Sequence, residues 1–192
     1  MASVGGGKAS GEPLTGSELT VRWATVLVVA IVLCLVDLVT KELVFRWLGP
    51  PQGSTVWWIW PNYVGFQTAL NHGALFGMGQ GMVPVFVVFS LVAVAGIVYW
   101  LWSGAIGDWG LTLTLALILG GILGNLYDRL GLWSLPGLAG DTRAVRDWIL
   151  LQYGPDYVWP NFNLADSFLV CGAALLAWRS LWTPASDSPV RT

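Results

Sequence analysis

The segment Leu-Gly-Gly-Ile-Leu-Gly-Asn-Leu-Tyr-Asp-Arg-Leu, residues 119–130, decides how this chain is organised. It closes an apolar run that begins at Trp109, and Asp128 and Arg129 are the first charged residues of that run. An aspartate placed at the centre of a bilayer costs about 2.5 to 3.5 kcal/mol on insertion scales, so it is seldom kept for packing alone. Asp128 is therefore a candidate functional residue.

The same polar spacing returns at the start of the last apolar run. Asn163 precedes Asp166 by three residues, just as Asn125 precedes Asp128. Residues three apart are neighbours on one face of a helix, so each asparagine lies beside its aspartate. Two Asn/Asp pairs at the ends of two apolar segments are the feature that a functional interpretation has to explain.

The composition indicates an integral membrane protein. Of the 192 residues, 55% are hydrophobic and only 10% are charged, and the mean hydropathy is +0.66. A net charge of -2 without any run of Lys or Arg argues against nucleic acid as a partner. Cys34 and Cys171 both lie in apolar runs, and no CxxC or Cys/His cluster occurs, so neither a disulfide nor a metal or other cofactor is expected.

Four apolar segments have the length and composition of membrane spans, which cross about 30 Å of hydrocarbon. We predict transmembrane helices at residues 23–41, 82–102, 109–127 and 164–182, and therefore a mainly α, four-helix membrane domain. The polar tails at 1–20 and 183–192 are expected to be disordered. Gly120, Gly121 and Gly124 are small enough to allow close helix contact.

Two longer segments separate the predicted spans. Residues 49–80 are broken by Pro and Gly between short strand-like stretches, which predicts a small β-cradle at the membrane surface. Its Trp57, Trp58 and Trp60 suit the interfacial belt. Residues 130–162 form a second loop, in which Val145–Tyr153 is predicted to be a short amphipathic segment on the bilayer surface.

A polar turn lies inside the predicted cradle. His72 is the only histidine, and a lone histidine without a second ligand or a nucleophile is interpreted as incidental. Its neighbours Asn71 and Gly73 are interpreted as a tight turn that could present an amide to a bound peptide.

The order of the spans brings the polar residues to one membrane face. Consecutive spans alternate in direction, so the end of the first, the start of the second, the end of the third and the start of the fourth lie on the same side. The polar residues at these positions are Asp37, Lys41, Asn71, Asn125, Asp128, Arg129, Asn163 and Asp166. We expect them to form one site.

The paired aspartates leave three functional classes open. Two carboxylates brought together in a poorly solvated place share one proton, which suits hydrolysis of a peptide by an activated water. A proton-coupled transporter is the second class, although four spans without internal repeats offer little for alternating access. A scaffold with capped helix ends is the third. Asp37 and Lys41, four residues apart, are interpreted as an ion pair at a helix end.

Five short motifs in this order resemble the lipoprotein signal peptidase family, signal peptidase II. They are Asp37-Leu-Val-Thr-Lys41, Asn71-His-Gly-Ala74 with Phe76, Gly124-Asn-Leu-Tyr-Asp-Arg129, Val145-Arg-Asp147, and Phe162-Asn-Leu-Ala-Asp166 after Trp159-Pro160. Leu38 and Leu75 depart from the residues that are common in the family, and the loop 132–144 is longer than usual.

The resemblance implies an aspartic endopeptidase that removes the signal peptide from prolipoproteins carrying a diacylglyceryl-modified cysteine. It assigns catalysis to Asp128 and Asp166, and it implies no metal. Positions that support the site or the substrate are Asp37, Lys41, Asn71, Gly73, Asn125, Arg129, Asp147, Asn163 and Ala165.

The resemblance also implies the setting in which the protein acts. It predicts a multi-pass protein of the bacterial inner membrane, with cytoplasmic termini and an active site at the outer face. The expected partners are the lipid-modified prolipoprotein, membrane lipid and cyclic peptide inhibitors such as globomycin, and the protein is expected to be a monomer.

Overall fold

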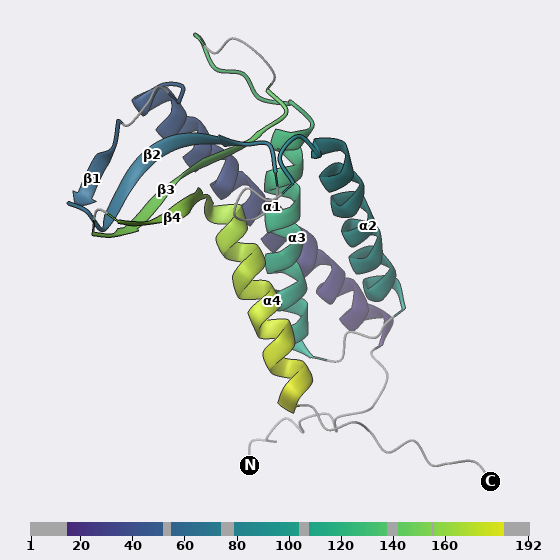
Figure 1. Ribbon diagram of the computed structural model, residues 1–192. Helices are drawn as coiled ribbons and strands as arrows, with labels where there is room; N and C mark the ends of the chain where they lie inside the picture. The colour runs from purple at the N-terminus through teal and green to yellow at the C-terminus, as the bar shows by residue number, and fades with distance from the viewer. Residues whose placement is uncertain are drawn as a thin grey trace, which may run out of the picture.

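The computed structural model describes residues 15–51, 55–73, 79–103, 108–137, 142–154 and 156–182. Its helices are α1 (Gly16–Leu48), α2 (Val83–Trp102), α3 (Trp109–Arg129) and α4 (Leu164–Trp182). Its strands are β1 (Trp57–Trp60), β2 (Val64–Asn71), β3 (Val145–Tyr153) and β4 (Tyr157–Phe162). The four helices form a bundle, and the sheet lies at the end of the bundle away from the start of α1 and the end of α4 (Figure 1).

Helix α3 is the centre of the bundle. It packs against α1, α2 and α4. In its most apolar 18-residue window 67% of the residues are buried, against 11–17% in the other three helices. The small positions predicted from the sequence make this contact possible, because a Cβ atom on Gly121 would lie 2.6 Å from the carbonyl oxygen of Ala165. All four helices are long and apolar enough to cross a membrane, which confirms the multi-pass membrane fold.

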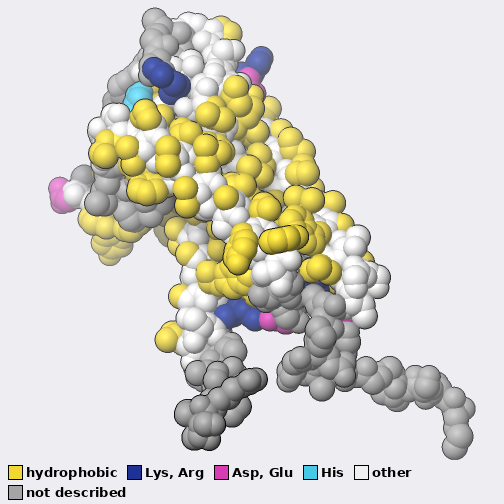
Figure 2. Space-filling view, turned by 90° about the vertical axis from the view of Figure 1, so that its right-hand side faces the viewer, with side chains coloured by type: hydrophobic (Ala, Val, Ile, Leu, Met, Phe, Trp, Pro, Cys, Tyr) yellow, Lys and Arg dark blue, Asp and Glu magenta, His cyan; other side chains and the backbone are white. Residues whose placement is uncertain are grey.

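The outer surface of the bundle suits a lipid environment. Large apolar side chains of α1 and α2 are exposed, among them Leu43 and Phe89. Figure 2 shows hydrophobic side chains spread over the face in view, whereas Lys, Arg, Asp and Glu gather near its two ends. Such a distribution is expected of a protein whose middle faces hydrocarbon and whose ends face water.

Helix α1 is longer than the predicted span. It begins at Gly16, because Thr15 and Glu18 form a capping box that satisfies the first backbone amides. It continues to Leu48, and Gly49 ends it with a φ of 81°. The prediction of a disordered tail is therefore wrong for residues 16–20, while residues 1–14 and 183–192 lie outside the described residues. Helix α3 also runs two residues beyond the predicted end, to Arg129.

Both long loops contribute strands to a single antiparallel sheet of order β1-β2-β3-β4. Strand β2 pairs with β3 through Asn71 and Val145 at one end and Val64 and Leu151 at the other. The interpretation of Val145–Tyr153 as an amphipathic segment on the bilayer surface is therefore wrong, because these residues form an inner strand whose backbone groups bond to β2 and β4. The cradle was predicted from residues 49–80 alone, and residues 145–162 form its other half.

Two apolar cores hold these parts together. The first lies between the helices and includes Val26 and Leu115. The second joins the far end of α1 to the sheet and includes Phe45, Trp133 and Trp148. The second core fixes β3 against the helical bundle, at the place where α3 ends and α4 begins.

Candidate active site

Asn163 is the centre of the polar cluster. It precedes α4, where its backbone N–H donates to Asp166 Oδ2 at 3.2 Å and its Oδ1 accepts from the Asp166 N–H at 2.9 Å. This reciprocal pair caps the helix and directs the Asp166 carboxylate back toward the sheet. The Nδ2 group of Asn163 donates to Asp147 Oδ1 at 2.6 Å and to Asn125 Oδ1 at 3.2 Å. One asparagine thereby connects α3, β3 and α4.

Asp147 and Asp166 form an interacting pair of acids. Burial, and next the negative charge of Asp166, raise the pKa of Asp147 to about 8 from an ordinary value of 3.8. The remaining hydrogen bonds to the two carboxylates come from amides, since Asn71 Nδ2 donates to Asp147 Oδ2 at 3.1 Å and Asn125 Nδ2 donates to Asp166 Oδ1 at 2.8 Å. Among the described residues, no Lys, Arg or His forms a direct ion pair with either carboxylate. The pair therefore retains a proton at neutral pH.

Lys41 orients the amide that contacts Asp166. Its Nζ donates to Asn125 Oδ1 at 3.0 Å. An ammonium group can only donate, so the oxygen of Asn125 faces Lys41 and its NH₂ group faces Asp166. Asp166 also lies in the first turn of α4, where the helix dipole favours a negative charge. The Asn125 amide and the helix dipole are thus the two features that stabilise a negative charge on Asp166.

Asp128 has the opposite environment. It has no exposed area, and its Oδ1 accepts from Arg146 Nη2 at 2.8 Å and Nε at 3.2 Å. Its Oδ2 accepts from the Arg146 backbone N–H at 2.9 Å and lies 3.2 Å from Lys41 Nζ. Two cations and a backbone amide thus surround the fully buried carboxyl group of Asp128.

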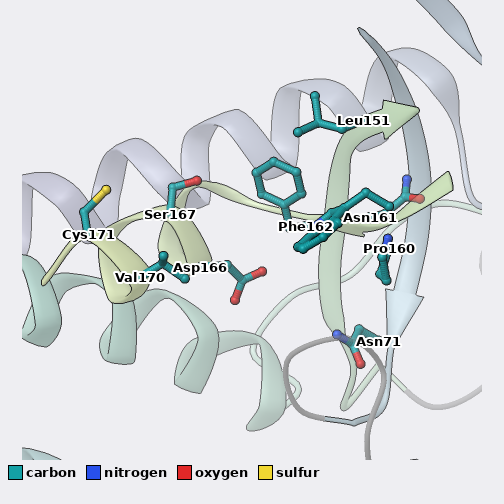
Figure 3. Close-up of a pocket in the computed structure, with 10 residues that line it drawn as sticks. Asn71, Leu151, Pro160, Asn161, Phe162, Asp166, Ser167, Val170 and Cys171 are labelled. Atoms are coloured by element: carbon teal, nitrogen blue, oxygen red, sulfur yellow. The ribbon is translucent and has the colours of Figure 1, made fainter. Parts of the chain in front are cut away.

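Beside Asp166 lies a cavity of about 350 Å³. Apolar side chains form most of its wall, including Leu151 on β3, Phe162 on β4 and Val170 on α4, and Asn71 forms part of its polar edge. Figure 3 shows the Asp166 carboxylate between the helix and the strands, with Phe162 on one side and Asn71 on the other. A carboxylate of the acid pair is therefore accessible from an apolar chamber.

The chain matches the model of a family described as signal peptidase (SPase) II over residues 29–182. A lipoprotein signal peptidase of Rhodopirellula baltica is 50% identical over 147 residues, which are 75% of this chain and 66% of that protein. A lipoprotein signal peptidase of Teredinibacter turnerae is 34% identical, over 80% of this chain and 85% of that protein. The chain belongs to the signal peptidase II family.

The fold of this signal peptidase II homologue is also known from solved structures. One described as a bacterial membrane enzyme superposes with a TM-score of 0.69 at 24% identity, covering 88% of this chain and 94% of that chain. A second with the same description gives 0.67 over 84% of this chain. Family membership confirms the resemblance stated from the motifs and decides among the three classes left open, in favour of a peptidase.

The structure contradicts the predicted pairing of Asp128 with Asp166. It brings Asp147 to Asp166 and binds Asp128 to Arg146 and Lys41. The physical reason is the course of β3, which runs past the end of α3 and places the Arg146 cation against Asp128 and the Asp147 carboxylate near Asp166.

The other predicted positions fall into two groups. Asn71, Asn125 and Asn163 contact the acid pair directly. Asp37 forms the expected ion pair with Lys41 at 2.7 Å, and in addition its Oδ1 accepts from the backbone N–H of Ala165 at 2.9 Å, which ties α1 to α4.

The predicted tight turn at Asn71 and Gly73 is present, and the Gly73 amide is bonded within it. Its N–H donates to Asn71 Oδ1 at 2.9 Å, and its carbonyl accepts from Arg129 Nη2 at 3.0 Å. Arg129 therefore holds this loop through the carbonyl group of Gly73. Motif residues Ala74 and Phe76, and the departure at Leu75, lie outside the described residues.

Sequence reasoning missed Arg146 and Glu42 as parts of the site. Arg146 is 2% exposed, and its Nη1 donates to Glu42 Oε2 at 2.9 Å. A signal was present, because Arg146 and Asp147 are adjacent and are the only charged residues of β3. Adjacent residues of a strand point to opposite faces, so both faces of β3 had to meet polar partners.

Proposed function

We propose that this signal peptidase II homologue removes signal peptides from lipid-modified prolipoproteins by attack of a water held between Asp147 and Asp166. The observation that carries the proposal is the contrast in neutralisation: these two carboxylates meet only amide donors among the described residues, and one of them lines an apolar cavity. Two acids that share a proton beside an apolar chamber suit hydrolysis of a peptide without a covalent intermediate.

The two acids have different roles in this proposal. Asp147, with a pKa near 8, holds the proton and donates a hydrogen bond to the scissile carbonyl oxygen. Asp166, stabilised as an anion by Asn125 and by the first turn of α4, takes a proton from the water. The water oxygen bonds to the carbonyl carbon, and the carbonyl electron pair moves to the oxygen that Asp147 protonates.

Collapse of this tetrahedral species completes the reaction. The bond between carbon and the amide nitrogen breaks, the proton collected by Asp166 passes to the departing nitrogen, and the proton on the former carbonyl oxygen returns to Asp147. The products are a carboxylic acid on the signal peptide and a new amino terminus, and both acids are ready for another cycle. No oxidant, reductant or metal enters this balance.

The cavity supplies the place for an apolar substrate. Leu151, Phe162 and Val170 face a space of about 350 Å³, which fits an apolar side chain of the signal peptide or part of an acyl chain. In this proposal the opening lies within a bacterial inner membrane, at the outer end of the bundle, with the termini on the cytoplasmic side. The apolar, exposed flanks of the helices support a membrane setting. A monomer supplies every residue of the proposed site, and a globomycin-like cyclic peptide would compete for the same chamber.

Cleavage of a lipid-modified prolipoprotein by the purified protein in detergent micelles tests the proposal. We expect Asp147→Asn and Asp166→Asn each to lower kcat by about 10³-fold or more, because each removes a group that must carry a proton in the reaction. Both variants should remain folded, since neither substitution separates a direct ion pair.

A matched control is Asp156→Asn, which changes an exposed aspartate in the turn between β3 and β4. It should cleave at the rate of the unaltered protein. Substantial cleavage by folded Asp147→Asn would reject the acid pair, and the absence of cleavage by the unaltered protein would reject the function itself.

A further inference from the structure

Arg146 uses its whole guanidinium group inside the protein. It donates from Nε and Nη2 to Asp128 Oδ1 and from Nη1 to Glu42 Oε2, and its carbon Cζ lies 4.8 Å from the ring centre of Trp133. Its backbone N–H adds a bond to Asp128 Oδ2 at 2.9 Å. One residue of β3 is thus bound to α1, to α3 and to the segment after α3.

The sheet alone holds this part of β3 weakly. Residues 145–147 pair with Asn71, Leu70 and Ala69 of β2, and the register of that ladder is irregular between Phe66 and Ala69. On the other side, the pairing with β4 begins only at Ile149 and Phe162. The start of β3 therefore pairs with only one strand, through a short ladder that ends at a register shift, and contacts with the helices add to its position.

Arg146 and Asp147 are consecutive residues that face opposite sides of the strand. The Arg146 side chain contacts Asp128 and Glu42, whereas the Asp147 side chain contacts Asn71 and Asn163. Any shift of Arg146 along or across α3 would move Asp147 by a similar amount. Because catalytic groups need placement within about 0.5 Å, such a shift would affect the reaction before it affected the fold.

We infer that Arg146 is a positioning residue that locks β3 onto α3 and α1 and so places the Asp147 carboxylate opposite Asp166. The inference rests on the proposed function, because it assigns a task to Arg146 only if Asp147 acts in cleavage. Arginine suits this role because its planar fork reaches two carboxylates at once, which the single ammonium group of lysine cannot reproduce with the same geometry.

Steady-state cleavage of a lipid-modified prolipoprotein in micelles, measured per folded molecule, tests the inference. We expect Arg146→Gln to lower kcat by about tenfold to a hundredfold, because displacement of a catalytic group by about 1 Å can cost that much. KM should change by less than about twofold, because the cavity wall is unaltered. Arg146→Lys, which keeps the charge without the fork, should give a kcat between the two.

The matched control is Arg46→Gln. Arg46 pairs with the same Glu42 at 2.5 Å, but its side chain is 66% exposed and it does not contact Asp128. We expect its kcat to stay within about twofold of the unaltered protein. Folded Arg146→Gln with an unchanged kcat would overturn the inference.

A second variant keeps the test decisive if Arg146→Gln does not fold. Glu42→Gln removes the ion pair between Glu42 and Arg146 and leaves Asp128 with its two cations. A lower kcat in this folded variant and in Arg146→Lys supports the inference. An unchanged kcat in both overturns it. One combination of results would reject the positioning role of Arg146 and still support the acid pair. In it, the unaltered protein and the Arg146 variants are fully active and Asp147→Asn is inactive.

Discussion

Asp128 and Asp147 are two buried carboxylates on opposite sides of strand β3, and the groups that contact them differ. Asp128 meets Arg146 and Lys41, which hold it with full charge–charge contacts. Asp147 is 2% exposed and meets Asn71, Asn163 and the negative field of Asp166. On the side facing α1 the carboxylate forms direct ion pairs with two cations, whereas on the side facing α4 the described residues form hydrogen bonds from amides and no direct ion pair.

In the proposed mechanism, this difference separates a structural acid, Asp128, from a reactive one, Asp147. A carboxylate that is paired with buried cations stays ionised and fixes the elements around it, but it has no spare proton to exchange. A carboxylate that is buried among amides beside another acid holds its proton to a higher pH and can exchange it with water. Asp128 and Asp147 are both buried acids, so the groups that contact each carboxylate decide its role.

Substitution of Asp128 should produce the largest change in stability. Asp128→Asn leaves Arg146 and Lys41 buried without one of their anions, so we expect the free energy of unfolding to fall by about 3 to 5 kcal/mol. Asp147→Asn separates no direct ion pair and relieves the repulsion with Asp166, so it should change that free energy by less than about 1 kcal/mol or increase it. Denaturant unfolding of both variants in detergent micelles measures the difference.

The opposite result would reverse the roles of the two acids. If Asp128→Asn were as stable as the unaltered protein but unable to cleave substrate, the pairing of Asp128 with Asp166 inferred from the sequence would be restored. In the unfolding measurement, Glu42→Gln is the control for the loss of an acid next to Arg146. Glu42 is partly exposed, and its loss leaves Arg146 bound to Asp128.

The helices could be predicted from the sequence and the sheet only in part. Four apolar runs give the four helices to within a few residues at most ends, because the period and length of an apolar run are local properties. The start of α1 was missed because it depends on the capping box of Thr15 and Glu18, not on hydropathy. Strand β3 was missed because its partners, β2 and β4, are identified only once the chain has folded.

The site shows the same division between local and distant information. The parity of the spans correctly gathered Lys41, Asn125, Asn163 and Asp166. The choice between Asp128 and Asp147 could not come from spacing, because the repeated Asn-x-x-Asp spacing selects Asp128 and Asp166, and Asp147 belongs to neither motif. That choice depends on Arg146, which approaches Asp128 only through the packing of β3 on α3.

A substitution at Gly124 tests the packing around Asp37, the ion-pair partner of Lys41, with a smaller expected effect. A Cβ atom there would lie 2.5 Å from Asp37 Oδ2 and 3.3 Å from Ala165 Cβ. We expect Gly124→Ala to lower the free energy of unfolding by about 1 to 3 kcal/mol, because Asp37 is fully buried and cannot move away freely. Gly96→Ala, at a helical glycine with open space around it, is the control and should not destabilise the protein. Equal stability of the two variants would show that the contact between α1, α3 and α4 is loose.

The pH dependence of cleavage examines the acid pair without changing a residue. The raised pKa of Asp147 means that the fold favours its protonated form, so the stability from this group is greatest below pH 3.8 and is lost as the pH rises through about 8. The value of kcat/KM should fall above about pH 8, by about tenfold per pH unit. The reason is that two ionised acids have no proton with which to polarise the carbonyl group. The measurement is kcat/KM for a lipid-modified prolipoprotein from neutral pH upward, with thermal unfolding followed in parallel. A rate that stays constant well above pH 8 would mean that Asp147 and Asp166 do not share a proton. The different environments of Asp128 and Asp147 would then not explain which acid acts in cleavage.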